Sequence, residues 1–182
     1  LERAKYFAKI LKVKDHKVIN IGFMKSLYGK NNALTDNRQK LSQVFTQNLV
    51  VPIRNAVFIT IATAWAMSIN AKVVAYGAHT GDIQHYPDCR PAFIAAFERV
   101  ANLATKAGVE GTVAFKIVTP LIDLTKAQII HRGVALGVEY SHTVSCYQAD
   151  DAGHACGSCD ACRLRRDGFA AAGVPDPTRY YR

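Results

Sequence analysis

Apolar runs of two lengths alternate along this chain. The longer runs, several with apolar residues three and four positions apart, predict helices. These helices span residues 1–12, 56–70, 91–107 and 126–136. Short, β-branched runs predict buried strands at residues 17–21, 72–77 and 113–118. Helices that alternate with short apolar strands favour an α/β domain built on a mainly parallel sheet.

Individual residues mark where two of these helices begin and end. Pro91 is suited to the first turn of its helix, since it has no N–H to leave unpaired. Thr125 is suited to cap the helix of residues 126–136, and Gly137 is suited to end it.

The longest uncharged run, residues 56–71, is apolar on nearly every side. Its polar positions are Thr60, Thr63, Ser68 and Asn70. It is shorter than the ~20 apolar residues that a membrane-spanning helix needs. We therefore expect a helix buried inside the domain and no membrane partner. Because no secretory signal precedes it, we expect a cytoplasmic protein.

The loops after the second and third strands are the predicted ligand site. In parallel sheets, ligands bind outside the carboxyl ends of the strands, here after Gly77 and Val118. Residues 77–90 hold two carboxylates, two histidines, a tyrosine and an arginine. Such a density of titratable groups predicts a functional site. We expect this loop to line the main pocket, on the same side of the sheet as Arg54.

Four of the five cysteines have the spacing of a metal site: Cys146, Cys156, Cys159 and Cys162. Two-residue gaps let a tight turn aim neighbouring thiolates at one ion, and zinc prefers four such ligands in a tetrahedron. A pair of disulfides and an iron–sulfur cluster are the alternatives. His142 and His154 flank the set and are candidates to replace one thiol, although surface histidines are the simpler interpretation. The fifth, Cys89, is expected to be a small buried residue without a metal.

The formal net charge is +9, from 23 basic and 14 acidic residues. Ten of the basic residues precede position 41, so the excess is mainly N-terminal. A basic surface suits nucleic acid, a polyanionic small substrate such as a nucleotide, or solvent alone.

An ordered series of motifs runs through the chain. It comprises Val51-Pro52-Ile53-Arg54-Asn55, Gly77-x-His79, Asp82, Tyr86-Pro87-Asp88-Cys89-Arg90, Thr119-Pro120-Leu121, Leu124-Thr125-Lys126, Thr143-x-Ser145-Cys146-Tyr147, Cys156-Gly157-x-Cys159-x-x-Cys162-x-x-Arg165, Gly168-Phe169 and Asp176-Pro177. Along its whole length the chain resembles the 7-cyano-7-deazaguanine synthases, which make the nitrile precursor of the tRNA bases queuosine and archaeosine. The resemblance implies a Rossmann-like fold of the adenine nucleotide α-hydrolase type with a C-terminal zinc knuckle.

One hallmark of that family is absent from these residues. Its members are pyrophosphatase-loop ATP enzymes, in which a Ser-Gly-Gly-x-Asp-Ser loop cradles the phosphates. This sequence contains no two adjacent glycines, and the family pattern puts that loop before the helix of residues 1–12. Since that helix starts at Leu1 without a capping side chain, we expect a fragment that is inactive alone. Ile53 stands where some relatives carry glycine, which we expect to have little effect.

The resemblance also implies a reaction. ATP activates the carboxylate of 7-carboxy-7-deazaguanine, with Mg²⁺ offsetting phosphate charge, and ammonia displaces the activating group to give an amide. A second activation then gives the nitrile. Asp82, Asp88 and Arg90 are the candidates for gripping the base and positioning ammonia. Arg54 and Lys126 are the candidates for contacting the nucleotide phosphates, with helix capping or surface pairing as the alternative for both. Asn55 is expected to cap a helix rather than to bind a ligand.

The predicted division is a nucleotide-binding domain over residues 1–140 and a zinc-binding subdomain over residues 141–182. Zinc closed by four thiolates has no open position and is expected to be structural. No direct contact with nucleic acid is expected, and a homodimer is left open. Two alternatives remain: another pyrophosphatase-loop enzyme, such as a tRNA thiolase with a reactive cysteine pair, and a non-catalytic zinc module that binds nucleic acid.

Overall fold

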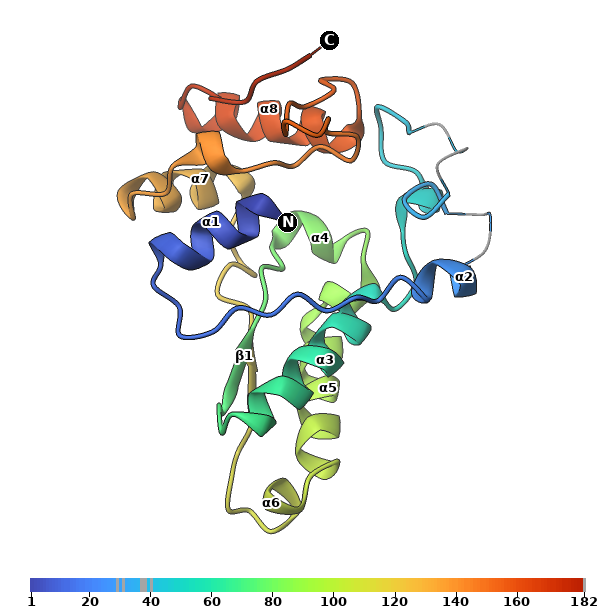
Figure 1. Cartoon of the computed structure of the whole chain (residues 1–182), viewed down its shortest axis with the longest axis vertical. Helices are drawn as coiled ribbons and strands as arrows, with labels where there is room; N and C mark the ends of the chain where they lie inside the picture. The colour runs from blue at the N-terminus through green and yellow to red at the C-terminus, as the bar shows by residue number, and fades with distance from the viewer. Residues whose placement is uncertain (29, 31, 37–38, 40, 182) are drawn as a thin grey trace. The chain divides into compact units, whose positions relative to one another are not determined.

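The structure is a computed structural model that describes all residues except 29, 31, 37–38, 40 and 182. The chain forms two compact units (Figure 1). One is continuous, Pro52–Ile129. The other combines Leu1–Val51 with Ile130–Arg182. Each unit is described by itself.

The continuous unit is built on two short parallel strands, β1 (Val73–Ala75) and β2 (Lys116–Val118). In their register Val74 pairs with Ile117. These two central residues are buried, while the residues on either side of each are exposed. This is the period of two that a sheet covered on one face requires.

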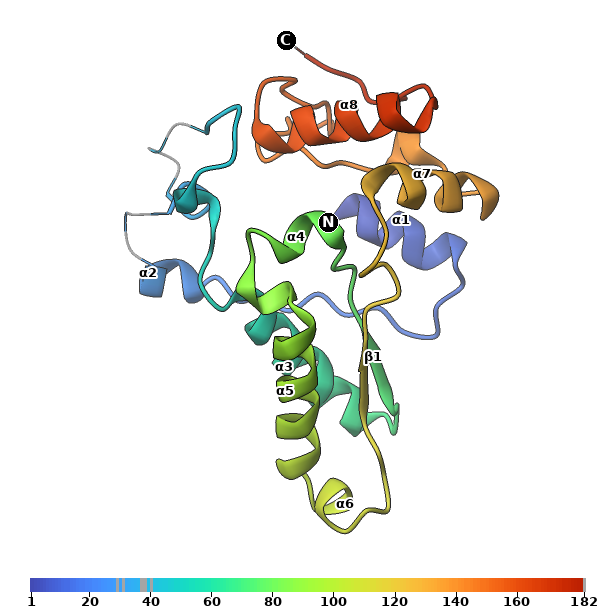
Figure 2. The same ribbon diagram turned by 180° about the vertical axis from the view of Figure 1, so that it is seen from behind.

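Two helices cover the buried face of this sheet, α3 (Arg54–Ser68) and α5 (Pro91–Leu103). They run side by side in both views (Figures 1 and 2). The shared core consists of Ile59, Ala66, Val74, Ile94, Ala101, Phe115 and Ile117. The unit also contains the short helices α4 (Thr80–Ile83), η2 (Pro87–Cys89) and α6 (Lys106–Val109). The sequence thus correctly predicted an α/β unit with a parallel sheet.

The helix predicted over residues 56–70 is present as α3, and its inner face lies in the core through Ile59 and Ala66. It is not covered on every side, since Phe58 is 47% exposed. The reason is that a two-stranded sheet covers only one side of the helix. The segment Gln47–Ser68 is long and apolar enough to cross a membrane by length and composition. It is interrupted by the turn at Pro52 and Ile53, and the buried side of α3 packs in the core described above.

The discontinuous unit is mainly helical. It contains α1 (Glu2–Ile10), α2 (Met24–Tyr28), η1 (Gln47–Leu49), η3 (Tyr140–His142), α8 (Asp160–Ala172) and most of α7 (Lys126–Ala135). As predicted, Thr125 caps α7, since its hydroxyl accepts from the Gln128 N–H at 3.3 Å. Gly137 follows the helix with a φ of 74°, the left-handed conformation that ends many helices.

The predicted strand at residues 17–21 is wrong. This segment is extended without ladder hydrogen bonds, and Val18 and Ile19 are 53% and 55% exposed. A strand is stable only when a neighbour satisfies its backbone groups. Among the described residues, β1 and β2 pair only with each other, and no segment lies in register beside residues 17–21.

Arg165 joins α8 to the rest of its unit by hydrogen bonds. The side chain is 7% exposed, and its Nε donates to Asp176 Oδ1 at 3.0 Å. Its other nitrogens donate to Thr143 Oγ1 and to the Tyr140 carbonyl. Asp176 also accepts from the hydroxyls of Thr178 and Tyr180, at 2.6 and 2.7 Å. Burial opposes ionisation of Asp176, but these donors outweigh it and lower its pKa.

Candidate metal centre and ligand-binding edge

The four predicted thiols meet at the start of α8. The sulfurs of Cys146, Cys156, Cys159 and Cys162 all lie within 4.8 Å of one another. The shortest separation is 3.5 Å, between Cys159 and Cys162, and the Cys156–Cys162 and Cys146–Cys159 pairs are each 4.0 Å apart. A tetrahedron with metal–sulfur distances of about 2.3 Å has edges of about 3.8 Å. The cluster therefore has the dimensions of a site for one tetrahedral ion.

Local backbone geometry aims these sulfurs inward. Gly157 has a φ of 72°, which permits the turn between the first two thiols of the motif. The backbone N–H groups of Ser158 and Cys159 point at Cys156 Sγ, both at 3.4 Å. Burial raises the pKa of Cys156, but these donors and the Ser158 hydroxyl lower it to about 6. A sulfur surrounded by donors is suited to bind a cation as a thiolate.

The alternative metal ligands and the disulfides do not fit these distances. All five cysteines are free, and no sulfur pair in the cluster approaches the ~2.05 Å of a disulfide. Neither flanking histidine joins the four-cysteine group. His154 Nδ1 lies 2.9 Å from Asp150, and His142 Nδ1 lies 3.2 Å from the Arg3 guanidinium.

The carboxyl ends of β1 and β2 are joined by their following loops. Thr80 donates from both its N–H and its hydroxyl to the Leu124 carbonyl, at 3.3 and 3.0 Å. These two hydrogen bonds hold the loop of residues 77–90 against residues 119–125. The polar groups of the two loops therefore share one edge of the sheet.

A carboxylate, an imidazole and an ammonium meet at this edge. His79 caps α4. Its ring nitrogen Nδ1 accepts from the Gly81 backbone N–H at 3.0 Å, and the His79 backbone N–H donates to Asp82 Oδ2 at 3.0 Å. The other ring nitrogen, Nε2, lies 3.5 Å from Asp82 Oδ2 and 3.2 Å from Lys126 Nζ. Burial is the main cause that lowers the pKa of His79; Asp82 opposes it and Lys126 adds to it. Since Nδ1 accepts a hydrogen bond, the proton of the neutral ring lies on Nε2.

Asp88 binds the first turn of α3. One carboxylate oxygen accepts from the Asn55 N–H at 2.9 Å and the other from its side-chain amide at 3.1 Å. An acidic group at this position satisfies free N–H groups and complements the helix dipole. The loop and Arg54, the residue before Asn55, therefore lie on the same side of the unit. Arg54 Nε is buried without a hydrogen-bond partner among the described residues.

Cys89 is buried beside Asp88 and lies outside the four-cysteine cluster. Its sulfur accepts from the Asn55 amide at 3.2 Å. Burial, followed by the charges of Asp82 and Asp88, raises its pKa to about 12. A thiol with this pKa is a poor nucleophile at neutral pH.

The catalytic candidates are brought together in part. Asp82 and Asp88 both accept hydrogen bonds at this edge, from His79 and from Asn55. Arg90 instead donates to the Ile83 carbonyl at 3.1 Å, a contact within the loop of residues 77–90. That this loop lines the main pocket stays a prediction, since the two cavities that the structure describes lie elsewhere. A cavity of about 360 Å³ lies in the discontinuous unit, and one of about 210 Å³ lies between α3 and α6. Residues 77–90 line neither of them.

Sequence reasoning gave no role to His79, which the structure places at the centre of this edge. Its place within Gly77-x-His79, directly after a strand, was the available signal. Asn55 was expected to cap a helix. Instead it is the second residue of α3, and the cap comes from Asp88, 33 residues further along the chain.

Comparison with known proteins was then decisive. A family profile described as queuosine biosynthesis protein QueC matches residues 1–173. A 7-cyano-7-deazaguanine synthase of Pseudomonas paraeruginosa (strain DSM 24068 / PA7) is 52% identical over 184 residues. That alignment covers 100% of this chain and 80% of the relative. The chain belongs to the QueC family.

Two further relatives support QueC membership. The 7-cyano-7-deazaguanine synthase of Stutzerimonas stutzeri (strain A1501) is 50% identical, covering 100% of this chain and 80% of the relative. That of Cupriavidus taiwanensis (strain DSM 17343 / BCRC 17206 / CCUG 44338 / CIP 107171 / LMG 19424 / R1) is 48% identical, covering 99% and 79%. The resemblance stated from the QueC motifs in the sequence is thereby confirmed.

Proposed function

We propose that this chain serves the ATP-dependent conversion of 7-carboxy-7-deazaguanine and ammonia to 7-cyano-7-deazaguanine, in queuosine biosynthesis. The observation that carries the proposal is identity of 48% or more to synthases over nearly the whole chain. A carboxylate resists attack by ammonia because oxide is a poor leaving group. ATP, with Mg²⁺, supplies the activation that creates a better one.

The proposed site is the edge formed by the loops after β1 and β2. Asp82 and Asp88 supply carboxylates for the base and for ammonia, and Arg90 holds the loop in shape through Ile83. Arg54, whose Nε has no described acceptor, and Lys126 supply positive charge for phosphate oxygens. His79 orients Asp82, whose Oδ2 accepts from the His79 backbone N–H, and the Lys126 ammonium lies 3.2 Å from the His79 ring. This edge corresponds to the ligand edge of a Rossmann-like sheet of the adenine nucleotide α-hydrolase type.

The four thiols are proposed to hold one structural Zn²⁺. Their sulfur–sulfur separations fit a zinc tetrahedron, and four protein ligands leave no position for a substrate. The proposed domain division remains residues 1–140 for nucleotide binding and residues 141–182 for zinc. A cytoplasmic location fits this chemistry, because free thiols persist in reducing compartments.

The alternatives predicted from the sequence lack support. A tRNA thiolase needs a reactive cysteine pair, whereas four thiols form the cluster and Cys89 is buried with a raised pKa. Family membership favours the synthase over a nucleic-acid-binding zinc module.

The test is an assay of AMP, pyrophosphate and nitrile release from 7-carboxy-7-deazaguanine, ATP and ammonia by the complete gene product. Lys126→Ala is expected to lower kcat/KM at least tenfold, while the exposed-site control Lys106→Ala leaves it unchanged. Absence of nitrile formation by the complete gene product would overturn the function.

A further inference from the structure

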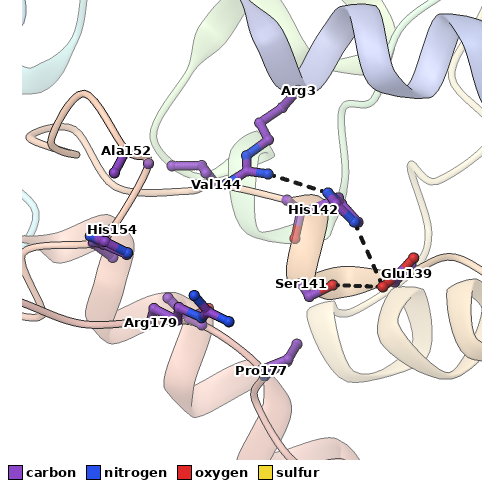
Figure 3. A pocket seen from close by; sticks show the side chains of 13 residues that line it. Arg3, Glu139, Ser141, His142, Val144, Ala152, His154, Pro177 and Arg179 are labelled. Carbon is purple, nitrogen blue, oxygen red and sulfur yellow. Dashed lines mark hydrogen bonds and ion pairs between the residues drawn. The ribbon is translucent and has the colours of Figure 1, made fainter.

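The discontinuous unit contains a cavity of about 360 Å³. Its volume is within the range of small-molecule sites. It is formed by the N-terminal turn of α1, residues 139–144, the loop before Cys156 and residues 177–179 (Figure 3). None of the residues assigned above to the reaction lines it.

Two guanidinium groups enter this cavity from opposite sides. Figure 3 shows Arg3 reaching in from α1 and Arg179 from the C-terminal segment. The Arg179 segment is fixed in place, because its carbonyl accepts from the Ala155 N–H at 2.8 Å. Both arginines are therefore held by ordered backbone.

The charges of these two arginines are not neutralised within the described part of the chain. Arg3 Nη1 donates to His142 Nδ1 at 3.2 Å. A ring nitrogen that accepts this bond is uncharged, so Arg3 keeps its full positive charge. No described carboxylate pairs with Arg3 or Arg179.

Among the described residues of the cavity wall, Glu139 is the one carboxylate, and it bonds to neighbouring side chains other than the two arginines. It accepts from the Ser141 hydroxyl at 3.0 Å and from the Tyr6 hydroxyl at 3.2 Å, and it lies 3.7 Å from His142 Nε2. The His142 ring is also stacked on Tyr6, with centroids 3.9 Å apart. Glu139 and Tyr6 thus hold His142, and His142 holds Arg3.

We infer that this cavity binds a small oxyanion, held between the guanidinium groups of Arg3 and Arg179. Planar guanidinium groups match the paired oxygens of a carboxylate or a phosphate. Within the proposed reaction this chemistry has two sources, the phosphates of pyrophosphate and the carboxylate of the substrate base. For the base, this cavity would be a second site, separate from the edge at Asp82 and Asp88 where the reaction is proposed to take place. Binding of the base carboxylate rests on the proposed function, because that base is the proposed substrate. Binding of pyrophosphate is tested without any reaction taking place.

The experiment follows the histidine Cε1–H resonances of the complete gene product by NMR. Those of His142 and His154, assigned by replacing each with Gln, report locally because both rings line the cavity. Three probes are titrated: inorganic pyrophosphate, 7-carboxy-7-deazaguanine, and 7-deazaguanine, which lacks the carboxylate. Saturable shifts with the first identify a phosphate ligand, and shifts with the second but not the third identify the substrate carboxylate.

Arg3→Gln and Arg179→Gln are each expected to raise Kd for the active probe at least tenfold. The control, Arg99→Gln, removes an exposed guanidinium from α5 and should leave Kd unchanged. The inference is overturned if neither pyrophosphate nor the carboxylated base shifts these resonances, or if binding survives in the Arg3→Gln/Arg179→Gln double variant. Because nitrile formation is not the readout, this outcome is separate from failure of the proposed function.

Discussion

At the scale of single residues, Ile53 stands out because, among the described residues other than glycine with a positive φ, it alone is branched at Cβ. It immediately precedes α3 with φ 59° and ψ 14°, the left-handed region, and its side chain is 68% exposed. That conformation costs a side chain with a Cβ about 1–2 kcal/mol. Little effect was expected of this residue from the sequence, but the backbone indicates strain.

Replacing Ile53 by glycine is therefore expected to stabilise the protein by about 1 kcal/mol, since glycine adopts this conformation freely. The matched control is Ile69→Gly, at a position 55% exposed with a φ of −109°. There the same change should lower the free energy of unfolding. Denaturant titration of both variants is the measurement. If both variants lose the same free energy of unfolding, Ile53 carries no strain.

His79 leads to a prediction about pH. Burial, opposed by Asp82 and assisted by Lys126, lowers the pKa of His79 in the folded protein below the ordinary value of a histidine, about 6.5. The unfolded chain then binds more protons than the folded one between the two pKa values. The stability due to neutral His79 is thus present above about pH 6.5 and is lost as pH falls through the folded pKa.

The test compares the wild type with His79→Asn, since Asn keeps an acceptor to cap α4. The stability difference between the two proteins should shift in favour of the variant as pH falls from 7 to 5. A difference that does not change with pH would contradict the assignment. Taking the difference removes the pH dependence that both proteins share, including that of the thiols.

At the scale of elements, the cysteine cluster determines the start of α8. Of its four thiols, that of Cys159 immediately precedes the helix and that of Cys162 lies in its first turn. Metal binding to such a cluster contributes directly to folding. The order of this element should therefore depend on the ion.

Cys159→Ser is expected to lower the zinc content below one ion per chain and to cost several kcal/mol of stability. Cys89→Ser is the control, because Cys89 lies outside the cluster. Metal analysis and thermal unfolding of both variants are the measurements. Full zinc content in Cys159→Ser, or loss of zinc in Cys89→Ser, would show that the ligand set is different.

At the scale of the whole molecule, elements with strong local signals were the ones predicted correctly. Pro91 opens α5 and Gly137 follows α7, because these residues restrict or release the backbone themselves. The four cysteines were predicted from spacing alone. The strand at residues 17–21 failed because strand formation depends on a neighbour, which local sequence does not reveal. Likewise Asp88 caps α3 from 33 residues away, and no local pattern indicates such a contact.

Arg165 tests how one unit is held together. Its guanidinium bonds join α8 to residues 140–143 and to Asp176. Removing one partner of a buried ion pair costs about 3–5 kcal/mol, since the other charge is left unpaired. Arg165→Leu is therefore expected to lower the unfolding midpoint strongly. Arg132→Leu, at an exposed position of α7, is the control; similar midpoints for the two variants would contradict this role.

The discontinuity of one unit has a consequence for the order of folding. The Arg163 side chain donates to the Gln43 carbonyl across 120 positions of sequence, whereas Pro52–Ile129 is contiguous. Distant partners meet more slowly than near ones, because closing a longer loop costs more chain entropy. During synthesis, residues 1–51 also cannot pack against residues 130–182 until the intervening segment has left the ribosome. We expect amides of β1 and β2 to become protected from hydrogen exchange before those of α8 in pulse-labelled refolding, and simultaneous protection would argue for one cooperative step.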